Sequence, residues 1–193
     1  MVAYKQVRVM HKIEAHDRLE REHRQHVIAI DQECFSQEPS STALTWAEMR
    51  PDMYNVLTVK GQVLGYGLVI PVTALACEAL KRGEMSEDEL TLKYITSVSR
   101  CAGLYLASMA STKKAGAIIR SRLVGYTMGT LLRAPKEVFT VAVTTDGASV
   151  AQELVGMSPS QYTGPMAGIN GYRPTLFCRP PRGMTNPSLV ANC

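Results

Sequence analysis

The residues whose types and spacing most clearly indicate a binding site lie in the segment 108–117, SMASTKKAGA. Lys113 and Lys114 precede Gly116 there, at the apparent passage from an apolar strand to a long helix. The N-terminus of a helix already carries about half a positive charge, so two lysines gain nothing from it and an anion would balance them. Unpaired N–H groups of a first helical turn, a glycine that permits close approach and two cations together form a phosphate cradle. The segment therefore predicts an anion-binding site. The Walker pattern G-x-x-x-x-G-K-[ST] is absent, which argues against a nucleotide triphosphatase.

The charge around this cradle is one-sided. Between Cys101 and Lys136 there is no acidic residue, whereas the whole chain has 21 Lys and Arg against 17 Asp and Glu, a net charge of +4. That net charge is too small to indicate a nucleic-acid-binding protein. A nucleic-acid-associated protein that uses the basic helix at 113–136 is one hypothesis. We rank it last of three, because the aromatic residues that would stack on bases are not interleaved there. The basic residues of the stretch are Lys113, Lys114, Arg120, Arg122, Arg133 and Lys136.

Neither histidine nor cysteine spacing indicates a metal site. The histidines follow no H-E-x-x-H pattern, and the five cysteines form no C-x-x-C pair, so we predict no bound metal and no disulfide framework. We expect the histidines to lie on a polar helix face and the cysteines to be in a reducing, cytoplasmic compartment, since no secretory or membrane-spanning segment is found. The histidines are His11, His16, His23 and His26, and the cysteines are Cys34, Cys77, Cys101, Cys178 and Cys193.

Elements that would position the cradle follow from periodicity. A length of 193 residues with 46% hydrophobic and 20% charged residues indicates one globular domain. Two β-branched runs around Lys60-Gly61 predict a hairpin, in which Gly65 and Gly67 indicate a bulge or a close backbone approach. We expect a loop with one helical turn at 36–52 and a helical excursion at 73–99. The expected strands are 4–10, 55–59, 62–72, 103–109, 138–143 and 175–179, and the expected helices are 15–34, 111–134 and 146–155.

Four segments in this order resemble the GNAT superfamily of acyl-CoA-dependent N-acyltransferases. They are ECFSQEPSS, VLTVKGQVLGYGLVI, LYLASMASTKKAGA and VFTVAVTTDGASVAQELVGM. The resemblance implies an α/β (α+β) fold: a mixed, mostly antiparallel sheet of six to seven strands flanked by about four helices, with the helical insertion at about 73–99. It also implies a single acyltransferase domain at 1–180, followed by a Pro-rich tail at 181–193.

The resemblance assigns coenzyme A binding residue by residue. Against the family pattern [QR]-x-x-G-x-[GA], Lys113 replaces Gln or Arg, Gly116 is retained and Ile118 occupies the Gly or Ala position. The strand expected to splay from its neighbour, and so to hold the pantetheine and the thioester, contributes backbone groups. The implied cofactor-binding residues are Leu106, Ala107, Ser108, Lys113, Lys114, Ala115, Gly116, Ala117 and Ile118.

The implied function is transfer of an acetyl group from acetyl-CoA to a primary amine. The acceptor stays open among proteins, aminoacyl-tRNA and small molecules, and a charged tRNA is the only nucleic acid expected as a partner. A homodimer is also left open.

No general base is identified: the strand 103–109 has no carboxylate or histidine, and Glu33, Tyr105 and Tyr162 are weak candidates. Trp46 is either an acceptor contact or a core anchor. Gln152 replaces the family tyrosine that commonly protonates the thiolate, so the alternative is a CoA-binding module with little or no catalysis.

Overall fold

The computed structural model describes residues 12–35, 40–133, 136–154, 157–164, 166 and 172–179. The strand expected at 4–10 and the Pro-rich tail at 181–193 lie outside these residues. Among the described residues, no helix has the length and apolar composition that crossing a bilayer would require.

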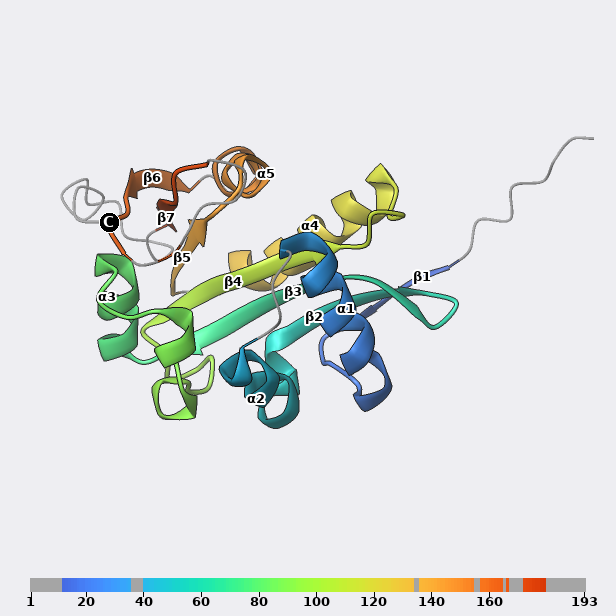
Figure 1. Cartoon of the computed structure of the whole chain (residues 1–193), viewed down its shortest axis with the longest axis horizontal. Coiled ribbons are helices and arrows are strands. Elements are labelled where there is room, and N and C mark those ends of the chain that lie inside the picture. Colours follow the sequence, from blue (N-terminus) through green and yellow to red (C-terminus); the bar gives the residue numbers. More distant parts are fainter. Residues whose placement is uncertain are drawn as a thin grey trace, which may run out of the picture.

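A seven-stranded sheet forms the centre of the molecule, in the order β1-β2-β3-β4-β5-β7-β6 (Figure 1). Only β4 and β5 pair in parallel, and every other neighbouring pair is antiparallel. This confirms the predicted mixed, mostly antiparallel sheet. The strands are β1 (Ile13–His16), β2 (Tyr54–Val59), β3 (Gln62–Val72), β4 (Gly103–Ser111), β5 (Glu137–Ala142), β6 (Ser158–Gln161) and β7 (Thr175–Arg179).

The predicted hairpin is β2 and β3, and its glycines act as expected. Lys60 and Gly61 both have positive φ, at 53° and 74°, which gives the turn a twist that suits a two-residue hairpin. The register shifts between Leu57 and Thr58 of β2, next to Gly65 of β3. At Gly67, a Cβ atom would lie 2.4 Å from Thr127 Oγ1, so the glycine allows a helix to approach the strand closely.

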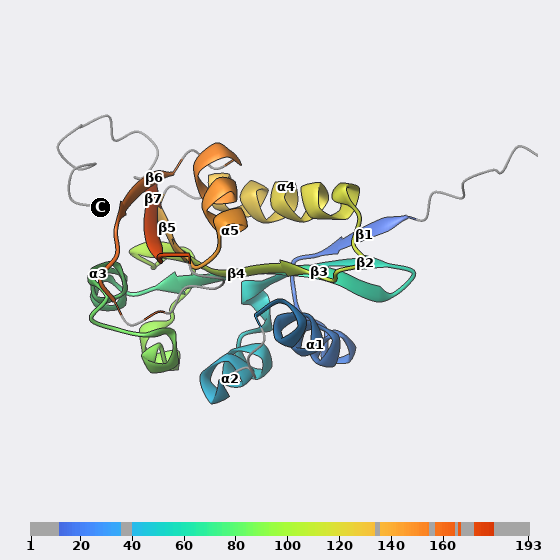
Figure 2. The same ribbon diagram turned by 45° about the horizontal axis from the view of Figure 1, so that its top comes forward.

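Helices cover both faces of the sheet (Figure 2). Viewed along its edge, α1 and α2 lie on one face, whereas α4 and α5 lie on the other. Two apolar cores follow this division: one includes Val27, Ile30 and Trp46, and the other includes Met128 and Leu131. The described α-helices are α1 (Arg24–Phe35), α2 (Ser41–Met49), α3 (Ala74–Arg82), α4 (Ala117–Arg133) and α5 (Thr145–Ser149), and α5 continues as a π-helical turn η5 (Val150–Leu154).

Several predicted boundaries are wrong. The segment 36–52 is not mainly loop, because α2 and the 3₁₀ turn η2 (Pro51–Met53) occupy most of it. Ser40 caps α2 by accepting a hydrogen bond from Ala43 N at 3.2 Å, a start signal hidden among turn-forming residues. The helix expected at 15–34 begins only at the 3₁₀ turn η1 (Arg21–His23), because β1 ends at His16. The strand β6 was not predicted, since Pro159 interrupts the strand pattern. It lies at one edge of the sheet, where proline is tolerated.

The histidines do not share one polar helix face. His16 ends β1 and lies 3.0 Å from Thr58 Oγ1, whereas His23 is buried in η1 and its ring meets that of His16 edge-on. His26 is exposed on α1, and His11 lies outside the described residues. The reason is that the polar segment expected as one helix at 15–34 contains the end of β1 and the turn η1 before α1 begins at Arg24.

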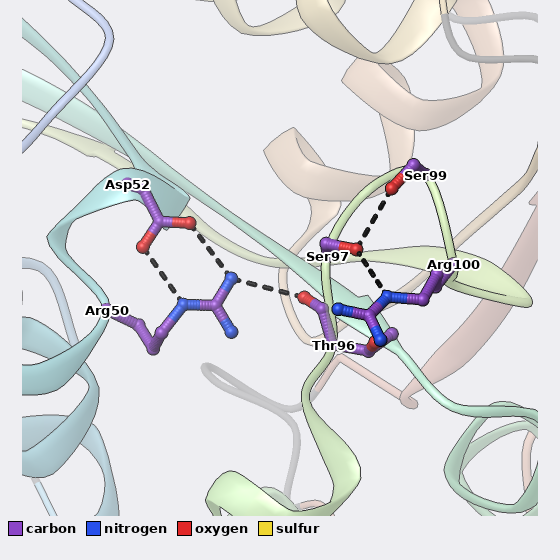
Figure 3. Close-up of polar contacts among 6 residues, drawn as sticks. All are labelled: Arg50, Asp52, Thr96, Ser97, Ser99 and Arg100. Atoms are coloured by element: carbon purple, nitrogen blue, oxygen red, sulfur yellow. Dashed lines mark hydrogen bonds and ion pairs between the residues drawn. The ribbon is translucent and has the colours of Figure 1, made fainter.

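The helical insertion at 73–99 is confirmed as α3 followed by the 3₁₀ turns η3 (Glu87–Glu89) and η4 (Leu92–Tyr94). Gly83 ends α3 with φ of 69°, as a C-terminal glycine cap does. A polar clip holds the far end of the insertion (Figure 3): Arg50 donates to both carboxylate oxygens of Asp52, each at 2.9 Å, and to Thr96 O at 3.1 Å. The insertion is therefore tied to the end of α2.

Candidate active site

Strands β4 and β5 separate in the middle of the sheet. They pair only from Gly103 with Glu137 to Tyr105 with Phe139, although β4 continues to Ser111 and β5 to Ala142. Beyond Tyr105, β5 and its neighbours β7 and β6 turn away from β4 (Figure 2). Thr140 Oγ1 partly bridges the opening by donating to Leu106 O at 2.7 Å. The splay expected at residues 106–108 is therefore present in the structure.

A β-bulge lies where the strands separate. Leu68 pairs with Ser108 and Val69 pairs with Leu106, so Ala107 is an extra residue in β4. Side chains alternate between the faces of a regular strand, and a bulge interrupts that alternation. Consequently Ala107 and Ser108 both line one cavity of about 540 Å³, whereas Leu106 packs into the core on the α4 side of the sheet.

The cavity is apolar with an acidic lining. Elements α1, α2, η3 and strands β2 to β5 contribute to it, and its described lining contains no lysine, arginine or histidine. Such a composition suits an uncharged or cationic ligand better than an anionic one. The aromatic residues of the lining are Phe35, Trp46, Tyr54 and Tyr66, and its carboxylates belong to Asp31, Glu87 and Asp88.

One polar chain crosses the cavity from α1 to the bulge. The Tyr66 hydroxyl donates a hydrogen bond to Asp31 and lies 2.9 Å from Ser108 Oγ. Burial raises the pKa of Asp31, and the bond from Tyr66 offsets part of that rise. The pKa of Tyr66 is also raised, by its burial and by the Asp31 carboxylate, so the phenol holds its proton. The chain connects a carboxylate to the bulged strand.

A second polar contact enters from the insertion. The Tyr105 hydroxyl on β4 donates a hydrogen bond to Glu87 of η3. Burial raises the pKa of Glu87 to about 7, against the lowering effect of the Tyr105 bond. A carboxyl with such a pKa is divided between its protonated and ionised forms near neutral pH, and this makes it competent for proton transfer.

The predicted cradle lies between β4 and α4. Ala115 N donates to Thr112 O at 2.9 Å, which closes a turn over Lys113 and Lys114. The helix begins at Ala117, so the prediction that the lysines lie inside its first turn is wrong: Gly116 is the last residue before it. The turn holds both lysines ahead of the helix because Thr112 N remains bonded to Leu64 O at 2.9 Å.

The cradle leaves donors available. Within the described chain, the N–H groups of Gly116, Ala117 and Ile118 have no hydrogen-bond acceptor. Both lysines are exposed, as is Ile118 at 69%, and a hollow over the first turn is lined by Ala117, Ile118, Ser121 and Arg122. Ala115 is buried and supports the turn from within. These unpaired donors and cations can bind an anion.

The structure sorts the remaining candidates. Glu33 is exposed on α1 and does not line the cavity. Tyr105 is fully buried and reaches the cavity only through Glu87. Trp46 is 2% exposed and donates from Nε1 to Leu90 O at 3.0 Å, so it is a core anchor, and its side chain also lines the cavity. Tyr162 is buried and close enough to Glu87 for that carboxylate to raise its pKa, after the larger effect of burial. Gln152 is exposed on η5.

Sequence reasoning missed Asp31, Tyr66 and Glu87. Asp31 belongs to a charge-rich helix, and Tyr66 lies between two glycines of a hairpin strand, so neither side chain is distinctive in the sequence. The sequence Ser86-Glu87-Asp88-Glu89 marks a helix start, and Glu89 does fill that role by accepting bonds from Ser86 N and Oγ. No local pattern shows which of these acids turns inward.

One further group of potential metal ligands lies between α3 and the start of β5: Cys77, Glu78 and Glu137. Lys81 Nζ binds Glu78 at 2.9 Å and Glu137 at 3.1 Å, so an ammonium group already supplies the counter-charge. This cluster is an ion-pair network that joins α3 to the sheet.

Comparison with solved structures identifies the fold. The loading GNATL domain of CurA from Lyngbya majuscula superposes with a TM-score of 0.64 at 10% identity, covering 88% of this chain and 98% of that one. Naa50 of Arabidopsis thaliana, in complex with the bisubstrate analogue CoA-Ac-MVNAL, gives 0.59 at 9% identity, covering 86% and 97%. Diaminobutyrate acetyltransferase EctA of Paenibacillus lautus, in complex with its substrate L-2,4-diaminobutyric acid and coenzyme A, gives 0.57 at 10%, covering 89% and 96%. The fold is therefore GNAT-like. The sequence matches no protein-family model and no curated protein at a significant level.

Proposed function

We propose that this protein is an N-acetyltransferase that transfers an acetyl group from acetyl-CoA to a primary amine bound in the cavity. The observation that carries the proposal is the splay of β4 from β5 with the bulge at Ala107, because a cavity opens beside the part of β4 that no longer pairs with β5. Solved proteins of this fold support it: Naa50 is in complex with a CoA-derived bisubstrate analogue, and EctA is in complex with coenzyme A and an amine substrate.

Acetyl-CoA would enter from the cradle side. The diphosphate would bind Lys113, Lys114 and the N–H groups of Gly116, Ala117 and Ile118, since charge-assisted bonds to phosphate are the strong ones. Ala115 would support this turn from the core. The pantetheine would run along Leu106, Ala107 and Ser108, where β4 no longer pairs with β5. Acetyl-CoA would serve as a co-substrate rather than as a resident group.

The chemistry needs an oriented thioester, a neutral amine and a donor for the tetrahedral oxyanion. Main-chain N–H groups at the bulge are suitable donors because they are fixed before the substrate arrives. The amine would approach from the cavity, whose three carboxylates favour acceptors without negative charge.

Two measurements test the proposal in sequence. Calorimetric titration with acetyl-CoA measures binding of the acetyl donor, which the proposed function requires. Release of free coenzyme A thiol is then measured with n-butylamine, 1,4-diaminobutane, glycinamide and glutamate as acceptors. Turnover with an uncharged or cationic acceptor supports an enzyme, whereas no acetyl-CoA binding refutes the proposal.

The second candidate is a CoA-binding module without efficient catalysis. The observation that favours it is Gln152, which stands for the family tyrosine and whose side chain is exposed on η5. Tight acetyl-CoA binding without thiol release in the presence of any of the amines would establish this alternative.

A further inference from the structure

We propose that the helical insertion supplies the general base of the acetyl transfer: the carboxylate of Glu87 takes the proton of the acceptor amine. This inference rests on the proposed function and names a residue for the proton transfer that β4 itself cannot perform. No residue of β4 (Gly103–Ser111, GLYLASMAS) carries a carboxylate or an imidazole.

Glu87 shares its cavity with the residues at which the thioester would lie. Ala107 and Ser108, the two residues at the bulge, line the same 540 Å³ space as Glu87. Tyr105, which binds Glu87, is the last residue of β4 paired with β5 and comes directly before the splay. The carboxylate is thus anchored to the strand at the point where the strand opens.

The turn that carries Glu87 is held from both sides. Thr42 Oγ1 of α2 donates to Asp88 O at 2.8 Å, and Trp46 Nε1 donates to Leu90 O at 3.0 Å. Glu89 closes the turn by accepting from Ser86 N at 2.8 Å. Glu87 is therefore a side chain on fixed backbone, and its neighbour Glu89 takes the capping role. A catalytic group needs such positioning.

The charges around Glu87 set its proton affinity. Its pKa is raised to about 7: burial is the largest cause, the hydrogen bond from Tyr105 lowers the pKa, and the carboxylates of Asp31 on α1 and Asp88 on η3 add to the rise. Tyr162, which follows β6, also lies within electrostatic range. Such a pKa lets the group be ionised at neutral pH and still accept a proton readily.

The proton balance is complete without another reactant. Glu87 takes one proton from the substrate ammonium, and the neutral nitrogen then forms a C–N bond to the acetyl carbon. The C–S bond breaks, the thiolate of coenzyme A leaves, and it takes the second proton of the nitrogen. Glu87 returns its proton to solvent, so one acetyl transfer releases coenzyme A thiol, the amide and one proton.

The test compares Glu87→Gln with Glu84→Gln. Glu84 lies on the same insertion, is exposed and pairs with Arg82 at 2.8 Å, so its variant controls for loss of a carboxylate. Thiol release is measured from pH 5.5 to 10 with the amine of the panel that the wild type uses best, together with acetyl-CoA affinity and thermal unfolding. For the wild type we expect kcat/KM to rise with pH through a midpoint near 7, where Glu87 ionises.

Glu87→Gln should lower kcat by about 10²-fold or more, should remove the limb near pH 7 and should leave acetyl-CoA affinity unchanged. Tyr105→Phe, which removes the bond that lowers the pKa of Glu87, should move that limb to higher pH. This shift tests the positioning role of Tyr105 even where the Gln variant does not fold. Glu84→Gln should behave as the wild type.

A folded Glu87→Gln variant within threefold of the wild-type rate would overturn the proposal, as would a slower variant with its pH limb in place. Unchanged pH behaviour of Tyr105→Phe would do the same. These results leave the wild type active and so differ from a failure of the proposed function, in which the wild type itself binds no acetyl-CoA or releases no thiol.

Discussion

Replacement of Gly116 by valine should weaken coenzyme A binding without unfolding the protein. Gly116 is the last residue before α4, and a Cβ atom there would meet nothing within 4 Å. Its φ is not positive, so a side chain causes no backbone strain. The fold itself therefore does not need a glycine at this position. A glycine would be needed only to let a ligand approach the neighbouring N–H groups.

The expected magnitude follows from the donors at stake. A branched side chain at Gly116 would stand beside the N–H groups of Ala117 and Ile118 and hinder the diphosphate. Loss of one hydrogen bond to a charged group costs about 1.5–3 kcal/mol, which corresponds to a roughly 10- to 150-fold larger Kd. The poorer capping residue should cost on the order of 1 kcal/mol or less of the free energy of unfolding.

Gly125→Val is the matched control, because Gly125 lies in α4, is exposed, and a Cβ atom there would also meet nothing within 4 Å. Calorimetry with coenzyme A measures Kd, and thermal unfolding monitors the fold. We expect at least a tenfold weakening for Gly116→Val and less than a twofold change for Gly125→Val. Equal Kd values for the two folded variants would refute the assignment of the diphosphate to the start of α4.

Three further outcomes are expected. Replacing Lys113 and Lys114 together by Glu should raise the Kd for acetyl-CoA at least tenfold, and because both side chains are exposed the effect should shrink as salt is raised; an affinity equal to the wild type in calorimetry at low salt would contradict this. Gln152→Ala should cost little activity, since an amide cannot protonate the thiolate; a large loss of thiol release with intact acetyl-CoA affinity would show a direct role. The pKa of Glu87 is raised in the folded state, so its contribution to the free energy of unfolding is present at pH 4 and is lost as pH rises through about 7. Urea unfolding of Glu87→Gln should lack that loss, and an identical pH dependence in both proteins would argue against the burial of this carboxyl.

The sequence itself predicted the parts of the fold that depend on local pattern. The hairpin followed from two β-branched runs around Lys60-Gly61, and the change from strand to helical pattern indicated the insertion at 73–99. The junction between strand and helix near 108–117 was also predicted, although the lysines precede the helix and do not lie in its first turn. Such patterns involve only a few consecutive residues, and local backbone conformation is enough to form the corresponding turns and helix ends.

Boundaries near competing signals were less predictable. Ser40 and Pro51 read as loop residues, yet one caps α2 and the other begins η2. Whether Ser40 and Pro51 bound a helix depends on whether the residues between them can bury one apolar helix face. Trp46 and Ala47 are buried only because they pack against the sheet and the insertion. Tertiary packing decided this helix.

The cavity and its acids were decided by tertiary structure alone. Asp31, Tyr66 and Glu87 come from a helix, a hairpin and an insertion, and each looks ordinary within its own segment. They line one cavity because α1 packs against β3 and β4 and because Thr42 and Trp46 of α2 bind the turn that carries Glu87. The raised pKa of Glu87 arises from burial and from neighbouring carboxylates distant in the chain. Desolvation and charge proximity are properties of three-dimensional surroundings, so the sequence indicated the proposed cradle but not the proposed base.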